Sequence, residues 1–360
     1  MPDGLSLDEI SRLLVWTAVA IYALAFIAYA IDLGRRSDIA IQQKDAAKQR
    51  ELVGAGVSAS ASTAPGGSLD EMRAEQQAAK AELEAPLARR ARYLWARIGT
   101  SLTVLGFLFH VAGDVLRGVA SGRVPWSNMY EFALTGTMLI VAVYLVVLFK
   151  YDLRFLGTFI TGLVVVLLGG TVIWFYTAVV PLSDPLKSVW LVIHVFVASL
   201  ATALFALAFA LSVLQLMQTR RERLAIAALS APEEGGAAAA TSTPRRRGLR
   251  FLRTLPAGDV LEALAYRFTI IGFIFWTFTL IAGSIWANDA WGRYWGFDTK
   301  EVWTFVIWVL YAGYIHARAT RGWRGTRSAW LSIVGFAAVM FNFTIVNLFF
   351  KGLHVYSGLN

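Results

Sequence analysis

The residues best suited to chemistry in this sequence are four histidines and one run rich in tryptophan. The run, 286–303, reads WANDAWGRYWGFDTKEVW and mixes four Trp, one Tyr and one Phe with two Gly and five charged residues. Trp and Tyr often anchor helices at lipid headgroups. So many flat side chains, beside glycines that let a ligand approach the backbone closely, fit the binding of a large planar apolar ligand better than membrane anchoring. Arg293 and Lys300 are candidates for meeting carboxylates on its rim.

Two of the histidines, His194 and His354, lie near the ends of different apolar segments, level with the Trp-rich run. A His near a helix end is more often a packing or capping residue than a ligand. Two neutral imidazoles on opposite faces of a porphyrin, however, are a standard way to hold haem iron. The pair and the planar-ligand run together favour a haem site. His110 and Asp114 share one helix face, which fits either a structural hydrogen bond or a ligand with its orienting partner.

The elements that must position these residues are membrane helices. The chain of 360 residues is 57% hydrophobic and 16% charged, with a mean hydropathy of +0.57, whereas soluble domains carry about 25% charge. Backbone groups in lipid must be satisfied within each segment, so apolar runs of this length predict helices. We expect an all-α polytopic membrane protein with eight spans, at about 13–33, 98–117, 132–149, 155–177, 188–216, 266–286, 302–316 and 329–350.

The basic residues predict an orientation. The segments that follow the first, third, fifth and seventh spans carry 26 of the 33 Lys and Arg. Cytoplasmic segments hold such an excess, so both termini and the Trp-rich loop are expected outside the cytoplasm. This topology accounts for the net charge of +9 without a nucleic-acid partner.

Two cytoplasmic stretches, about 37–90 and 229–247, are rich in small and polar residues and predict disordered linkers. Part of 68–95 also fits a charged surface helix. The predicted organisation has five parts: a first membrane helix (1–33), a largely disordered linker (34–96), membrane helices two to five (97–217), a second linker (218–260), and membrane helices six to eight with the loop 284–303 (261–360).

The run WANDAWGRYWGFDTKEVWTFVIWVLYAGYIHAR resembles the "WWD" signature of cytochrome c assembly membrane proteins. More closely, the chain resembles the CcsA/ResC-type subunit of the system II cytochrome c synthase, which actinomycete-like naming calls CcsB. PWSNMYE at 125–131 resembles the family's PxSNxYE motif, and SVWLVIHV and GLHVYSG resemble its two outer His motifs. Family members often have Trp at the position of Phe297 and Pro at that of Thr299.

The resemblance implies that haem b is the bound substrate. His194 and His354 would hold its iron at the outer face, and His316 would hold haem iron on its way from the cytoplasm. Asp298 would join the two outer histidines among the catalytic residues. The remaining residues implied to contact haem are aromatic: Trp286, Trp291, Tyr294, Trp295, Phe297 and Trp303.

The implied activity is that of a cytochrome c synthase (haem lyase type) subunit in the bacterial plasma membrane. Two thiols of a CxxCH segment in apocytochrome c add across the haem vinyl groups. The absence of cysteine in this chain fits that scheme, because the substrate supplies both nucleophiles. The implied partners are a CcsB/ResB-type membrane subunit, apocytochrome c, a thiol-reducing thioredoxin-like protein and the lipid bilayer.

Three other interpretations stay open at this point. A CcmC/CcmF-type haem delivery protein shares the signature, but we expect a different length or number of spans. A haem transporter without ligase activity would show paired helix interruptions. A respiratory cytochrome b would place pairs of His on the same helix, whereas the four His here fall on separate segments.

Overall fold

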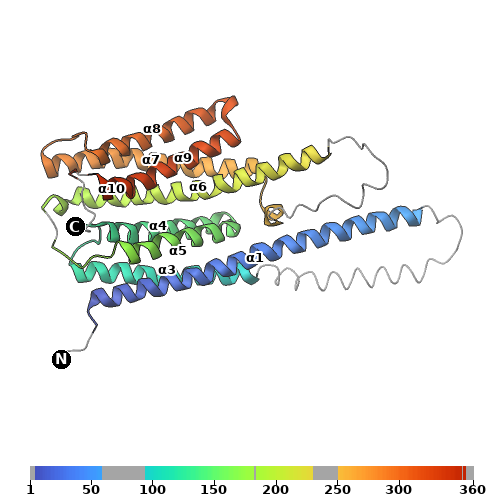
Figure 1. Ribbon diagram of the computed structural model, residues 1–360, viewed down its shortest axis with the longest axis horizontal. Coiled ribbons are helices and arrows are strands. Elements are labelled where there is room, and N and C mark those ends of the chain that lie inside the picture. The colour runs from blue at the N-terminus through green and yellow to red at the C-terminus, as the bar shows by residue number, and fades with distance from the viewer. Residues whose placement is uncertain (1–4, 59–93, 182–183, 230–249, 351, 354–360) are drawn as a thin grey trace.

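The computed structural model describes residues 5–58, 94–181, 184–229, 250–350 and 352–353. Every regular element in these ranges is a helix (Figure 1). The elements are α1 (Leu7–Ser58), α3 (Leu94–Ser121), α4 (Met129–Lys150), η1 (Arg154–Leu156), α5 (Gly157–Trp174), η2 (Asp184–Lys187), α6 (Val189–Leu229), η4 (Arg250–Thr254), α7 (Gly258–Trp291), α8 (Thr299–Ala319), η5 (Arg321–Trp323), α9 (Thr326–Phe343) and α10 (Ile345–Phe349).

Seven helical segments among the described residues are long and apolar enough to cross a membrane, which confirms the predicted polytopic helical fold. The segment predicted at 302–316 forms α8 and is not one of the seven. It carries Lys300 and Glu301 in its first turn and Arg318 in its last turn, and it is rich in Trp and Tyr between them, so its hydropathy is lower. It nevertheless runs beside α7 and α9 (Figure 1): Trp308 donates to the Thr277 hydroxyl of α7 at 3.0 Å, and Trp303 packs on Phe341 of α9.

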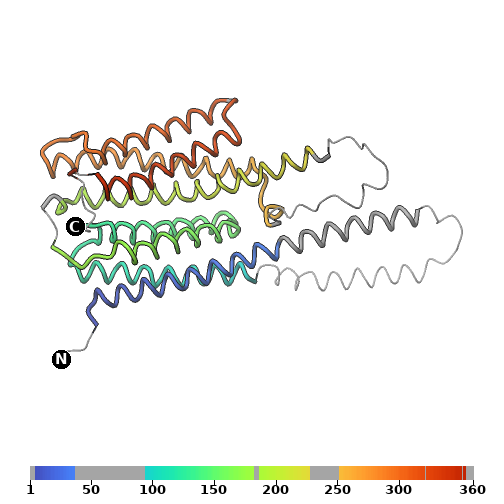
Figure 2. The backbone as a smooth tube through the Cα atoms, in the orientation of Figure 1, coloured from blue at the N-terminus to red at the C-terminus, as the bar shows by residue number. Residues whose placement is uncertain are grey.

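The helices form two groups that lie side by side (Figure 2). In the first group, α1 packs against α3 and α5 because glycines face its tyrosines. A Cβ atom at Gly157 would come within 2.6 Å of the Tyr29 ring. In the second group, α6 packs against α7 and α9, and Phe205 stacks on Tyr311 with ring centroids 3.7 Å apart. Small residues at membrane-helix contacts allow this close approach.

Helices α1 and α6 continue furthest beyond the predicted spans. Helix α1 extends past residue 33 to Ser58, through part of the expected linker, and α6 extends past residue 216 to Leu229 (Figure 1). Hydropathy marks where lipid ends, and a polar segment rich in Ala and Gln can continue a helix beyond that point. The rest of the two predicted linkers, together with most of the surface helix predicted at 68–95, lies outside the described residues.

The two ends of the bundle differ in chemistry. We call one the basic end, because it holds the α4–α5 and α8–α9 turns with Lys150, Arg154, Arg324 and Arg327. The other, the cavity end, holds the α3–α4 turn, the α7–α8 connection and α10 (Figure 1). The alternation of the helices therefore gathers basic segments at one end, as the sequence pattern requires.

Candidate functional site

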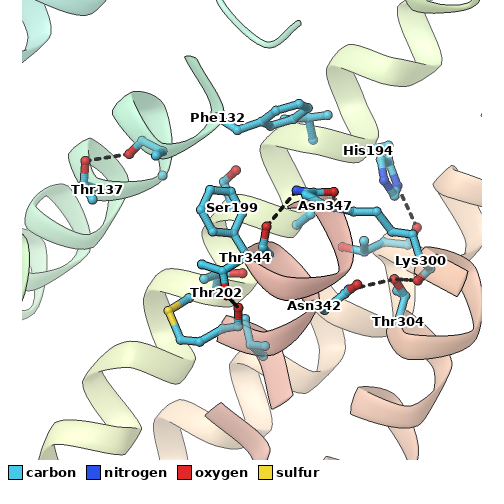
Figure 3. Close-up of a pocket in the computed structure, with 18 of the residues that line it drawn as sticks. Phe132, Thr137, His194, Ser199, Thr202, Lys300, Thr304, Asn342, Thr344 and Asn347 are labelled. Atoms are coloured by element: carbon cyan, nitrogen blue, oxygen red, sulfur yellow. Dashed lines mark hydrogen bonds between the residues drawn. The ribbon is translucent and has the colours of Figure 1, made fainter. Parts of the chain in front are cut away.

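A cavity opens at the cavity end between helices α4 to α10. The centre of a water molecule can move through about 240 Å³ of it. Most of its wall is apolar, including Phe132, Leu191 and Trp286. Its imidazole, ammonium and amide groups come from the side formed by α6, α8, α9 and α10, as Figure 3 shows for His194, Lys300, Asn342 and Asn347. The cavity therefore combines an apolar body with one polar flank, the usual form of a site for a large organic ligand.

His194 lies near the start of α6, and its ring is held by α7. The Nδ1 atom lies 3.0 Å from the carbonyl oxygen of Thr279, and the ring stacks on Trp286 with centroids 5.8 Å apart at 23°. A carbonyl oxygen can only accept a hydrogen bond, so Nδ1 donates it. In the neutral imidazole, Nε2 then carries the lone pair, which is the form that ligates a metal.

Gly283 makes this arrangement sterically feasible. A Cβ atom at Gly283 would lie 2.7 Å from Cε1 and 2.8 Å from Nδ1 of His194. Neither Gly283 nor the Thr279 carbonyl was among the residues selected from the sequence. A backbone carbonyl carries no residue-type signal, so only the packing of α6 against α7 reveals it.

His110, unlike His194, does not line the cavity but packs between helices. It is completely buried, its Nε2 donates to the Leu134 carbonyl at 3.0 Å, and its Nδ1 lies 3.4 Å from the Tyr22 hydroxyl. Asp114 instead accepts from the Thr135 hydroxyl at 3.1 Å. The possible bond between His110 and Asp114 is therefore replaced by contacts of each residue with neighbouring helices, and both ring nitrogens of His110 have partners.

Of the other two candidate histidines, His316 is described by the structure and does not line this cavity. His316 is exposed in the last turn of α8, about 24 Å along that helix from Lys300. His316 therefore belongs to a different level of the bundle, near the basic end. His354 lies outside the described residues, the last of which are Gly352 and Leu353.

The Trp-rich run is divided between two helices and the turn between them. Helix α7 continues to Trp291 and ends at Gly292, whose φ of 70° is the left-handed conformation common at helix C-termini. Trp286 is 2% exposed, lines the cavity and meets Trp291 edge-on with centroids 4.9 Å apart. Helix α8 then begins at Thr299, so Trp303 is helical and packs on Phe341 at 4.4 Å.

The turn itself presents aromatic side chains to the outside. Tyr294 is 61% and Phe297 80% exposed, and Trp295 meets Phe297 edge-on at 6.2 Å. Phe297 has a φ of 56°, which is uncommon for a bulky residue. Of the six aromatic residues predicted to contact the ligand, Trp286 is the one in the cavity wall among the described residues. The others lie beside it, behind it or on the outer surface of the turn.

The charged residues of the run hold the turn and the chain end in place. Glu301 accepts from the backbone N–H of Gly296 at 2.8 Å and of Asp298 at 3.1 Å. Asp298, the N-cap residue of α8, accepts from the Leu353 N–H at 3.2 Å. Lys300 donates to Asn347 Oδ1 at 2.5 Å and also lines the cavity. Arg293 is exposed and donates to the Gly296 carbonyl at 3.4 Å.

The second sequence motif, at 125–131, supports the same end of the bundle. Asn128 caps α4 by accepting from the Glu131 N–H at 2.9 Å. Glu131, which is fully buried, pairs with Arg117 at 3.0 Å and with Arg123 at 2.7 Å. Arg117 also pairs with Asp8 at 2.5 Å. This buried network joins α1, α3 and α4 beside the cavity.

The fold and site thus define a polytopic helical membrane protein with a histidine-bearing cavity at one end. The family model for "Cytochrome C assembly protein" matches residues 126–354. The chain belongs to this family, whose role is in cytochrome c biogenesis.

Curated relatives agree. The chain is 33% identical over 258 residues to "Cytochrome c biogenesis protein CcsA" of Heterosigma akashiwo, which covers 66% of this chain and 77% of the relative. It is 34% identical over 272 residues to the protein of that name from Guillardia theta, covering 73% and 86%. It is 32% identical over 282 residues to the protein of that name from Synechococcus elongatus, and this match covers 72% of this chain and 87% of the relative.

Among solved structures, "Cytochrome c Heme Lyase CcmF" shares the fold with a TM-score of 0.58 and 15% identity. The match covers 95% of this chain and 47% of that protein, so the chain spans about half its length.

Proposed function

We propose that this chain binds haem b as a substrate at the cavity end and presents it for covalent attachment to apocytochrome c. His194 and His354 hold the iron from opposite faces. The chain acts as a subunit of a cytochrome c synthase of the haem lyase type. The name of the curated relatives, cytochrome c biogenesis protein, supports the pathway.

The observation that carries this proposal is the fixed ring of His194. Its Nδ1 donates to the Thr279 carbonyl at 3.0 Å, and its face rests on Trp286. These two contacts set both the tautomer and the direction of Nε2, as the outer partners of metal-bound histidines generally do. His194 is also the histidine in the cavity wall among the described residues.

The cavity suits a porphyrin in its chemistry. Its apolar wall offers a surface for the macrocycle, with Trp286 next to the proposed ligand. Lys300 and Asn347 lie on the polar flank and provide a cation and an amide for the propionates. Tyr294 and Phe297 project from the turn, where an incoming polypeptide can meet them.

The reaction itself is an addition. Each S–H of the CxxCH segment adds across one vinyl group, forming a C–S bond while the hydrogen ends on the second vinyl carbon, so no oxidant is consumed. The chain has no cysteine and contributes none of the reacting bonds. Its residues orient the substrate, occupy both iron positions and restrict the access of oxygen until the histidine of the CxxCH segment replaces one of them.

The cavity end faces the outside of a bacterial plasma membrane, with both termini on that side. The distribution of Lys and Arg supports this orientation, because 26 of 33 belong to the four segments assigned to the cytoplasm. There the partners are a CcsB/ResB-type membrane subunit, apocytochrome c and a thioredoxin-like protein that keeps its thiols reduced. His316, near the basic end, receives haem at an earlier stage.

The test is the haem content of the purified membrane complex together with the yield of c-type cytochromes in the same cells. We expect His194→Ala and His354→Ala to lose haem and cytochrome yield, and added imidazole to restore part of the haem. His110→Gln is the matched control, since an amide N–H can replace the Nε2 donor to Leu134. Normal haem content and normal yield in both Ala variants would overturn the proposal.

A further inference from the structure

We propose that Lys300 is the specificity-determining residue of the cavity and that it recognises a carboxylate on the ligand, whether or not the ligand carries a metal. This role rests on the proposed function for the identity of the ligand as a porphyrin, but not for iron ligation by the histidines. Its basis is the charge of the cavity wall. Among the described residues that line the cavity, Lys300 is the one permanent cation, and none of them is acidic.

The charge of Lys300 is not balanced by the part of the chain that the structure describes. The half-buried ammonium group donates to Asn347 Oδ1 at 2.5 Å and forms no ion pair with a described residue. The neighbouring carboxylates of Asp298 and Glu301 accept hydrogen bonds from backbone N–H groups instead. A cation shielded from water is costly unless an anion pairs with it, so we expect the ligand to supply the anion.

Asn347 sets the position of the Lys300 ammonium group. Its Nδ2 donates to the Phe343 carbonyl at 2.8 Å, which leaves Oδ1 as the acceptor for Lys300. Asn347 is only 8% exposed, so its amide has little room to turn. An ammonium group has three N–H donors, and the bond to Asn347 uses one of them. Two donors therefore remain for a carboxylate at the polar flank of the cavity (Figure 3).

Three hydroxyl groups of the cavity wall are already committed to the backbone. Those of Thr137, Thr304 and Thr344 each donate, at 2.7 Å, to the carbonyl oxygen of the residue one helical turn earlier. A hydroxyl has a single O–H donor, so none of the three has a donor left for a ligand. Hydrogen bonds from a charged donor are also stronger than those from a neutral one. Lys300 is therefore the donor in this wall that best suits an anion.

Two porphyrins separate recognition of the carboxylate from ligation of iron. Protoporphyrin IX has the macrocycle and the two propionates of haem b but no iron. Its dimethyl ester has the same macrocycle without either negative charge. A cavity that recognises the carboxylate through Lys300 should distinguish these two molecules, although neither can be held by a histidine through a metal.

Three substitutions and one control test the role of Lys300. Lys300→Met removes the charge at similar length, and Lys300→Arg keeps the charge. Asn347→Leu keeps a side chain of similar volume but removes the acceptor that positions the ammonium group. Lys187→Met is the matched control, because Lys187 is an exposed cation just before α6 that does not line the cavity.

The measurement is the dissociation constant of each porphyrin for the full-length protein in nanodiscs of zwitterionic lipid, followed by porphyrin fluorescence. Lys300→Met should weaken binding of protoporphyrin IX about tenfold, as for loss of a hydrogen bond to a charged group, and leave binding of the ester unchanged. Asn347→Leu should weaken binding of the acid about threefold and again spare the ester. Lys300→Arg should bind the acid more tightly than Lys300→Met does, and Lys187→Met should match the parent for both porphyrins.

Equal weakening for the acid and the ester in Lys300→Met, or no weakening for either, would overturn the role of Lys300. If Lys300→Met does not fold, the same comparison in Asn347→Leu decides the question. His194→Ala separates this result from the proposed function, because it should weaken binding of haem but not of protoporphyrin IX. If His194→Ala weakens haem binding while Lys300→Met does not distinguish the porphyrins, the inference is wrong and the proposed function stands. If His194→Ala binds haem normally while Lys300→Met distinguishes the porphyrins, iron ligation fails and recognition of the carboxylate stands. If the parent binds neither porphyrin nor haem, both fail.

Discussion

Glu131 and Arg117 form an ion pair in which both side chains are completely buried. The other oxygen of Glu131 pairs with Arg123 at 2.7 Å, and Arg117 reaches Asp8 on α1. Two acidic and two basic side chains therefore balance each other beside the cavity. A network of this kind fixes the relative positions of α1, α3 and α4, on which the wall formed by Phe132 and Gly136 depends.

Removing Glu131 should destabilise the fold strongly. Glu131→Ala removes the buried carboxylate that Arg117 and Arg123 share, and breaking a buried ion pair costs about 3–5 kcal/mol. Thermal unfolding in detergent measures the effect. The matched control is Asp152→Ala, which removes the more exposed pair with Arg154, N to O 3.3 Å, and should cost under about 1 kcal/mol. Equal shifts for the two variants would contradict a structural role for the network.

Gly283→Ala should impair the site although it substitutes none of the candidate iron ligands. The added methyl group meets Cε1 and Nδ1 of His194 at 2.7 and 2.8 Å, so the ring must turn away from the Thr279 carbonyl. Loss of a ligand's orienting partner lowers metal affinity by about tenfold or more. Haem retained per protein on dilution measures this. Gly313→Ala on α8, with nothing within 4 Å of the added carbon, should retain haem as the parent does.

Replacing Phe297 should change the stability of the protein and its cytochrome yield in opposite directions. Its φ of 56° costs about 1 kcal/mol in a residue with a side chain, and glycine relieves that cost. Phe297→Gly should therefore raise the thermal midpoint slightly but reduce cytochrome yield, because the exposed ring is lost from the turn. Trp286→Ala, in contrast, should lower stability by about 3–5 kcal/mol as well as haem content. A fall in stability for Phe297→Gly would contradict this division.

We expect haem to meet His316 before it reaches His194 at the cavity end. His316→Ala is expected to reduce the haem found with His194 when the protein is made in cells. Haem supplied to the purified protein at the cavity end should then restore the spectrum, because His194 is untouched. His316 is exposed on α8, so its replacement leaves the core unchanged. Failure of supplied haem to restore the spectrum would contradict separate roles for His316 and His194.

Much of the fold could be predicted from the sequence because lipid imposes long apolar runs. The extent of α1 to Ser58 and of α6 to Leu229 could not, because hydropathy reports the membrane and not the helix. The division of the Trp-rich run did leave signals. Gly292 is a typical C-cap, and Asp298 followed by Glu301 is a capping box, so the helix boundaries were within reach of sequence reasoning.

The site was harder to predict because α6 and α7 are apolar on all sides. On such a helix, hydropathy does not indicate which face a residue occupies. Sequence position alone could not separate His194, held by the Thr279 carbonyl, from His110, which bonds to Leu134 and Tyr22. It also could not show that Phe297 is exposed while Trp286 is buried.

The most direct measurement is the electron paramagnetic resonance spectrum of ferric haem in the purified complex. We predict a low-spin, two-imidazole signal in the parent protein and a high-spin signal in His194→Ala and in His354→Ala. Added imidazole should return each variant to the low-spin form. A low-spin signal that persists unchanged in both variants, at full haem content, would show that these two residues do not hold the iron.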